Sequence, residues 1–144
     1  MKKLRLLKFD GVDLKGDYGL ISKQLRWVNW QRSIFKFIPK DFDQGNLVVF
    51  ELKYSIVKQV WQETKSLEKL KVLNLSHSKH LKSTPDFLKL LNLEKLIMKD
   101  CQSLSEVHKS IGDLKKIHLI NLKNCTSLAN LPRESYQLIS VKKH

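Results

Sequence analysis

The most constraining feature of this sequence is a short apolar pattern that recurs about every 23 residues. The pattern has apolar side chains at its first, fourth and sixth positions, and its clearest example is Leu70, Leu73 and Leu75. The first positions fall at residues 4, 25, 47, 70, 93 and 117, with steps of 21, 22, 23, 23 and 24 residues. A fixed period of this length predicts an array of stacked structural units, because a single unit is too small to bury its own apolar face.

The remainder of each unit keeps the same register. A mostly small side chain stands eight residues after each first position, at Val12, Ser33, Ser55, Ser78, Cys101 and Cys125. An apolar side chain returns soon afterwards, at Leu14, Phe35, Val57, Leu81, Leu104 and Leu128. Another inward position follows at Ile38, Val60, Thr84, Val107 and Leu131, with Pro39, Pro85 and Pro132 directly after three of them. This is the layout of a leucine-rich repeat. We expect the hydroxyls and thiols of the small position to bond backbone groups of neighbouring coils.

The repeat predicts an α/β fold, a leucine-rich-repeat solenoid or horseshoe. Its concave face would be a parallel β-sheet, and its convex side would consist of turns and short helices. Residues 1–144 would form one domain of about six repeats, starting at 4, 25, 47, 70, 93 and 117. Phe87 with Leu90, and Ile111 with Leu114, have the three-residue spacing of short 3₁₀ helices. No evident capping unit follows the last coil, so we expect its hydrophobic face to be poorly covered.

Charge sets the first expectation about partners. The chain has 27 Lys and Arg against 14 Asp and Glu, a net charge of +13, which favours an acidic partner such as nucleic acid, anionic lipid or an acidic protein face. The basic start at Met1–Lys3 lacks the apolar core of a signal peptide, and no stretch has the length of a membrane span. Two widely spaced cysteines suggest reduced thiols. We expect a cytoplasmic protein, with a nuclear location as the alternative.

Catalytic and ligand-binding motifs are not found in the sequence. No phosphate-binding loop is present, and the glycines fit isolated turns: Gly11, Gly16, Gly19, Gly45 and Gly112. His77, His80, Cys101 and His108 have no compact zinc spacing, and no serine stands in a nucleophile motif. We therefore expect no enzymatic activity, no cofactor and no metal. Asp86 and Trp61 are distinctive, but turn closure and convex packing explain them more simply.

The candidate binding residues are the outward positions on and just after the strands, because the concave sheet is the surface that solenoids use for binding. They are Trp27, Asn29, Arg32, Glu51, Lys53, Tyr54, Lys71, Asn74, Lys95, Lys99, His118, Asn121 and Lys123, with Gln31, His77 and Asp100 beside them. Nine basic residues on this side oppose four acidic ones, so we expect a basic face. Trp27 and Tyr54 are the preferred individual candidates, since aromatic anchors dominate interface energies.

Several coils also resemble a known family. The run Leu70–Ser78 followed by Thr84–Phe87, the run Asn92–Leu96 leading to Cys101, and Asn121–Cys125 are its most specific matches. They are similar to the leucine-rich-repeat region of plant intracellular nucleotide-binding immune receptors of the TIR class. The resemblance extends over essentially the whole chain, although Leu88 and Leu91 stand where the family usually has Ser and Pro.

The resemblance implies an interaction module of an immune receptor. Such a module would recognise a pathogen effector or a guarded host protein, and would restrain the nucleotide-binding switch domain of the receptor. We also expect no membrane partner, since no stretch has the length of a membrane span. Two alternatives stay open: a basic nucleic-acid-binding protein, disfavoured because the positive residues are spread over all repeats, and a truncated, non-signalling paralogue acting as decoy or adaptor.

Overall fold

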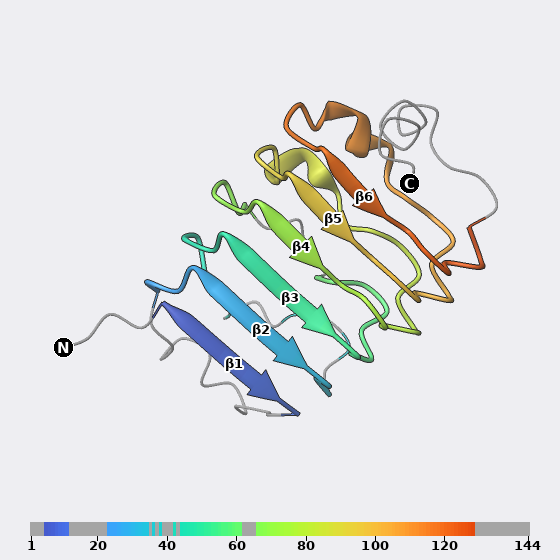
Figure 1. Cartoon of the computed structure of the whole chain (residues 1–144), viewed down its shortest axis with the longest axis horizontal. Helices are drawn as coiled ribbons and strands as arrows, with labels where there is room; N and C mark the ends of the chain where they lie inside the picture. The colour runs from blue at the N-terminus through green and yellow to red at the C-terminus, as the bar shows by residue number, and fades with distance from the viewer. Residues whose placement is uncertain are drawn as a thin grey trace.

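The fold is built on one parallel sheet of six short strands. The computed structural model describes residues 5–11, 23–34, 36, 38, 42, 44–61 and 66–128. The strands are β1 (Leu6–Asp10), β2 (Trp27–Gln31), β3 (Val49–Lys53), β4 (Val72–Asn74), β5 (Lys95–Ile97) and β6 (Leu119–Asn121). They lie side by side in sequence order, with the connections looping behind the sheet from one strand to the next (Figure 1). The predicted leucine-rich-repeat solenoid is confirmed.

Part of the predicted repeat pattern lies outside the described residues. This applies to the first position of the first unit, Leu4, and to further inward or turn positions at Val12, Leu14, Phe35, Pro39, Leu131 and Pro132. Gly16 and Gly19 lie outside them as well.

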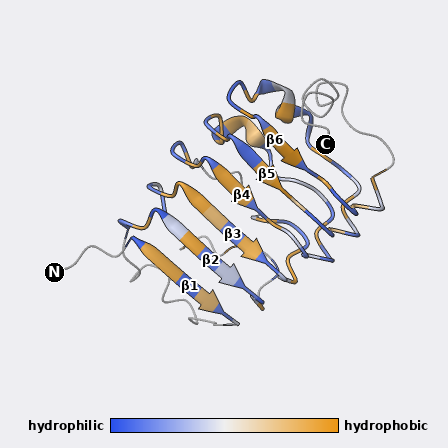
Figure 2. Ribbon diagram, viewed as in Figure 1, coloured by the Kyte–Doolittle hydropathy of each residue, from blue (hydrophilic) through white to orange (hydrophobic). Residues whose placement is uncertain are grey.

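All neighbouring strands pair without any shift in the repeat register. Leu7 aligns with Val28, Val28 with Phe50, and the same position continues through Leu73, Leu96 and Ile120. Because strand side chains alternate between the two faces, equal register places every inward position of the repeat on one side of the sheet. Figure 2 shows apolar residues recurring on strand after strand, with hydrophilic residues in the turns between them.

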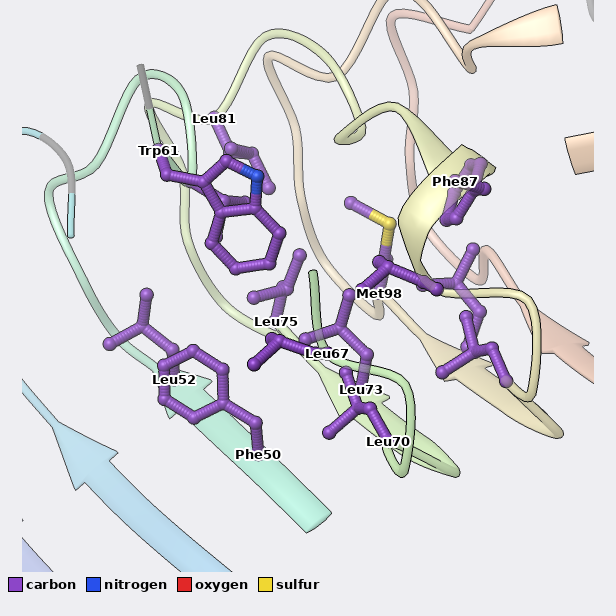
Figure 3. Close-up of a cluster of buried hydrophobic side chains, with 14 of the residues drawn as sticks. Phe50, Leu52, Trp61, Leu67, Leu70, Leu73, Leu75, Leu81, Phe87 and Met98 are labelled. Atoms are coloured by element: carbon purple, nitrogen blue, oxygen red, sulfur yellow. The ribbon is translucent and has the colours of Figure 1, made fainter. Parts of the chain in front are cut away.

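The core lies between the sheet and the return path. Figure 3 shows how consecutive coils contribute to one cluster, with Phe50 and Leu52 of β3 beside Leu73 of β4 and Met98 just after β5. The side chains of Leu73 and Met98 are fully buried. Burying one such side chain contributes about 1.5–3 kcal/mol, and here each is covered only by the coils on either side.

The return path carries two short 3₁₀ helices, η2 (Phe87–Lys89) and η3 (Lys109–Asp113). The Asp86 carboxylate caps η2 by accepting the Leu88 N–H at 2.9 Å, and this hydrogen bond lowers the pKa of Asp86. Ser110 of η3 joins the two helices, because its hydroxyl accepts the buried Phe87 N–H at 2.7 Å. The predicted one-face pairs Phe87/Leu90 and Ile111/Leu114 are buried, as expected.

The small positions after β4, β5 and β6, Ser78, Cys101 and Cys125, bond to the coil before them. Cys101 Sγ donates to the Leu75 carbonyl at 3.2 Å, and Cys125 Sγ donates to the Met98 carbonyl at 2.8 Å. The hydrogen bond with Cys125, followed by burial, raises the pKa of the Cys101 thiol. The expected bonding of neighbouring coils is therefore confirmed at these thiols. It is wrong at Ser33, whose buried hydroxyl has no hydrogen-bond partner among the described residues.

Candidate binding surface on the open face of the sheet

The outward side chains of the strands form a second surface, which we call the open face. Aligned strands place these side chains in rows that run across the sheet. The first row is Leu6, Trp27, Val49, Val72, Lys95 and Leu119. The second row is Lys8, Asn29, Glu51, Asn74, Ile97 and Asn121. The third row is Asp10, Gln31, Lys53, Ser76, Lys99 and Lys123, of which Ser76 is buried.

A fourth line of residues, the corner row, follows the third row where the chain leaves the sheet. Its members share a left-handed backbone, with φ between 53° and 66°: Gly11, Arg32, Tyr54, His77, Asp100 and Asn124. Five of them donate their N–H to the next coil at 2.7–3.2 Å, as Tyr54 does to the Ser76 carbonyl. Sequence reasoning did not detect this row as a unit. Arg32 and Tyr54 are not residue types that favour a left-handed backbone.

Side chains of the corner row contact one another across coils. The Tyr54 ring stacks on the His77 ring with centroids 4.6 Å apart and planes 9° from parallel. His77 Nδ1 lies 3.0 Å from the Asp100 carboxylate, which also accepts a 2.8 Å hydrogen bond from the Asn124 amide. At the other end of the row, the Arg32 guanidinium pairs with Asp10 through two nitrogens. The predicted binding residues Arg32 and Tyr54 are therefore held in place by their neighbours.

Glu51 organises the centre of the open face. One of its carboxylate oxygens accepts a 2.6 Å hydrogen bond from Trp27 Nε1, and the other lies 3.4 Å from Lys53 Nζ. The structure thus brings together three of the predicted residues. The Trp27 side chain is fixed through its nitrogen, while the residue stays 44% exposed.

Asparagines in the second row serve the backbone. The side-chain oxygens of Asn74 and Asn121 accept the N–H of Ser76 and of Lys123, both at 3.1 Å, and so close the ends of β4 and β6. Asn29 differs, because its side-chain oxygen is buried and has no hydrogen-bond partner in the part of the chain that the structure describes. Two of the predicted binding asparagines thus have a structural role that explains their presence.

Lys71 and His118 lie apart from the other candidates, just before β4 and β6 begin. Glu94 stands between them, with its oxygens 3.9 Å from Lys71 Nζ and 3.6 Å from His118 Nε2. These two residues therefore belong to the edge of the open face, at the end opposite to the corner row.

The four acidic residues of the open face all lie near a basic side chain, whereas three of the predicted binding lysines have no acidic partner among the described residues. Asp10, Glu51, Glu94 and Asp100 each lie within ion-pairing distance of a basic side chain. No carboxylate lies at ion-pairing distance from three predicted binding residues, as far as the structure describes the chain: Lys95, Lys99 and Lys123. Unpaired positive charge is therefore present at the β5–β6 end of the face.

Metal-binding and membrane-spanning features were also sought in the described residues. They contain no group of three or more His, Cys, Asp or Glu side chains placed to hold a metal ion. In the same part of the chain, no helix has the length and apolar character needed to cross a membrane.

The sequence of the chain is similar to those of several plant disease resistance proteins. The chain is 42% identical to the disease resistance protein RPV1 of Vitis rotundifolia over 95 residues, and 40% identical to the disease resistance-like protein CSA1 of Arabidopsis thaliana over 119. It is 32% identical to the TMV resistance protein N of Nicotiana glutinosa over 132 residues. These matches cover 66%, 83% and 92% of the chain. The chain belongs to the family of plant TIR-type disease resistance proteins.

The matched region is a small part of these relatives, since the chain spans 7%, 10% and 12% of their lengths. No family model matches the chain. A solved structure, the leucine-rich repeat domain of the type III effector XopL, superimposes with a TM-score of 0.70. It covers 82% of this chain and 40% of its own length at 23% identity, which supports the shared fold. Solenoids with this fold typically use their extended open surfaces for binding.

Proposed function

We propose that this chain is the interaction module of a plant intracellular immune receptor, which recognises a pathogen effector or a guarded host protein and restrains the receptor's switch domain. The observation that carries the proposal is the open face, a continuous six-stranded surface. It presents to solvent an exposed tryptophan and three lysines, Lys95, Lys99 and Lys123, that have no carboxylate partner among the described residues. The family relationship supports an immune context for that surface.

The arrangement of charges suits a protein ligand. Trp27 is held by Glu51 at 2.6 Å and Arg32 by Asp10, so these side chains lose little conformational freedom when a partner binds. Lys95, Lys99 and Lys123 would meet the carboxylates of the partner, which adds electrostatic steering and selectivity. We propose the nucleotide-binding switch domain of the same receptor as the intramolecular partner of these three lysines.

Charge reversal in the full-length receptor tests this proposal. Lys71, Lys95 and Lys123 are changed together to Glu, and cell death is scored in leaves that express the receptor without a pathogen. We expect the resting restraint to be released, because an acidic surface of the switch domain would now be repelled.

The matched control reverses three exposed lysines outside the open face, Lys58, Lys89 and Lys109. It should leave resting activity unchanged. If the open-face variant also stays at the resting level while accumulating normally, the proposed restraint through this face is wrong. Release by both variants would mean that overall charge, and not the open face, controls the receptor.

A further inference from the structure

The first row of the open face changes character along the solenoid. From β1 to β4 it is apolar, with Leu6 43% and Trp27 44% exposed and with Val49 and Val72 half-buried. At β5 the same row continues with the exposed Lys95, and it ends at β6 with the half-buried Leu119. A molecule lying along this row therefore meets an apolar strip first and a positive charge afterwards.

Further exposed apolar side chains lie where the chain leaves β2 and β3, at the same end of the open face as the apolar strip. Ile34, Tyr54 and Ile56 are 56%, 51% and 43% exposed, and they follow β2 and β3. Their equivalents after β4 and β5 are polar: Lys79 and Gln102 in place of the isoleucines, His77 and Asp100 in place of the tyrosine. The exposed apolar side chains of the first row and the corner thus gather at the β1–β3 end, which also carries the exposed Lys8 and the Arg32–Asp10 ion pair.

The opposite end carries the unpaired lysines. Lys99 and Lys123 are neighbours in the third row, on coils that stand about 4.8 Å apart as adjacent strands do, and Lys95 is on the same coil as Lys99. Asp100, the nearby acid of the corner row, is already occupied by His77 and Asn124. Like charges at this spacing repel each other, and a carboxylate from a partner would relieve the repulsion.

We infer that the open face binds a polypeptide segment that lies across the strands, with apolar side chains over the β1–β3 end and carboxylates over Lys95, Lys99 and Lys123. The inference rests on the proposed function and specifies the chemistry of its partner. Trp27 on β2 and Lys95 on β5 are separated by three strand spacings, about 14 Å. An extended segment covers that distance in about four residues, so its acids follow its apolar residue by four to six positions.

Nucleic acid and lipid fit this surface less well than a polypeptide. A nucleic-acid backbone needs positive charge along its whole track. Here the apolar strip interrupts the track, and Asp10 and Glu51 place carboxylates beside it. The two described helices, η2 and η3, have three and five residues, too short for an amphipathic membrane anchor.

Peptide selection tests the inference. A phage library of random 16-residue peptides is selected on the purified 144-residue chain. Binders are then counter-selected on the variant Lys95→Glu, Lys99→Glu, Lys123→Glu. We expect enriched peptides to place an aromatic or aliphatic residue four to six positions from a cluster of Asp or Glu. Fluorescein-labelled copies should bind at least tenfold more weakly to the triple variant and at least fivefold more weakly to Trp27→Ala, measured by fluorescence anisotropy.

The control variant Lys58→Glu, Lys89→Glu, Lys109→Glu has the same net charge as the triple variant and should bind within twofold of the unchanged chain. Circular dichroism of each variant checks that it is folded. Selected peptides without acids, no enrichment, or equal weakening by the control would overturn the inference. The inference would also be overturned if single-stranded DNA displaced the peptides and its binding were weakened by the same variants. The two proposals can fail separately. If the selected peptides have the expected pattern but the charge-reversed receptor stays at its resting level, only the proposed restraint of the switch domain is refuted.

Discussion

At the residue scale, the corner row shows how a regular backbone presents irregular side chains. Every coil turns out of the sheet through one residue with φ near +60°, a conformation that costs a non-glycine residue about 1 kcal/mol. Only Gly11 avoids that cost, whereas the five others carry side chains that contact the neighbouring coils. These contacts, including the Tyr54–His77 stack, offset part of the conformational cost of the left-handed backbone.

Asp86 gives a testable pH dependence at the same scale. The Leu88 N–H, then the Ser110 hydroxyl and the charges of His108 and Lys89, stabilise the ionised carboxylate and lower its pKa. Since the native pKa is below that of the unfolded chain, the contribution to stability is complete at neutral pH. It is lost as pH falls below about 4 through the native value. We expect Asp86→Asn to lower the urea midpoint at pH 7 and to make little difference at the most acid pH at which the chain is folded.

Urea unfolding of both proteins at several pH values measures this. Asn keeps a side-chain oxygen that can accept the Leu88 N–H, so the substitution removes the charge with a small change in shape. A difference in midpoint that stays constant from neutral to acid pH would contradict the electrostatic explanation.

At the scale of the element, the sequence predicts the strands better than the turns. Position four of each unit, such as Leu73 and Leu96, is buried in every coil from the second onward, and this periodic requirement is visible as spacing. The corner row obeys no such requirement on residue type, because its constraint is on the backbone. The repeat spacing also does not reveal that the exposed Leu6 belongs to the apolar strip of the open face. The alternation of side chains around Leu7 does imply that Leu6 points outward.

Ion pairs between side chains on different coils limited how well the basic face could be predicted from the sequence. The excess of basic residues on the strand side follows from counting, but Glu94 occupies Lys71 and His118, and Glu51 occupies Lys53. These contacts join residues 2 to 24 positions apart whose side chains were counted as independent charges. Three-dimensional pairing therefore decides which lysines stay available, and a count of charges cannot.

Two leucines separate core packing from surface exposure. Leu73 in β4 is fully buried, and replacing it by Ala should lower the free energy of unfolding by about 2–5 kcal/mol, since it removes apolar contacts and leaves a cavity. Leu91, which is 50% exposed, is the matched control, and Leu91→Ala should change it by less than about 0.5 kcal/mol. Guanidinium unfolding followed by circular dichroism measures both. Equal losses would mean that Leu91 packs more tightly in solution than its exposure indicates.

At the scale of the whole molecule, each coil is stabilised by its neighbours. β3 and β4 have a paired strand on both sides, whereas β1, among the described strands, pairs with β2 alone. The inward side chains of β1, Leu7 and Phe9, are only half-buried, while Val28 and Trp30 in β2 are completely buried. Stability in such an array is close to a sum of terms for each coil and each pair of coils, so the edge of the sheet should open first.

Amide hydrogen exchange followed by mass spectrometry measures that order of opening. We expect the amides of β1 to exchange at least tenfold faster than those of β3 and β4, because local opening at the edge breaks one interface and opening in the middle breaks two. Burial should act in the same direction, since Phe50 and Leu73 are covered from both sides. Identical exchange rates in β1, β3 and β4 would show that the sheet opens as one cooperative unit. The apolar end of the open face would then be as rigid as its centre, and not the part most easily reshaped by a partner.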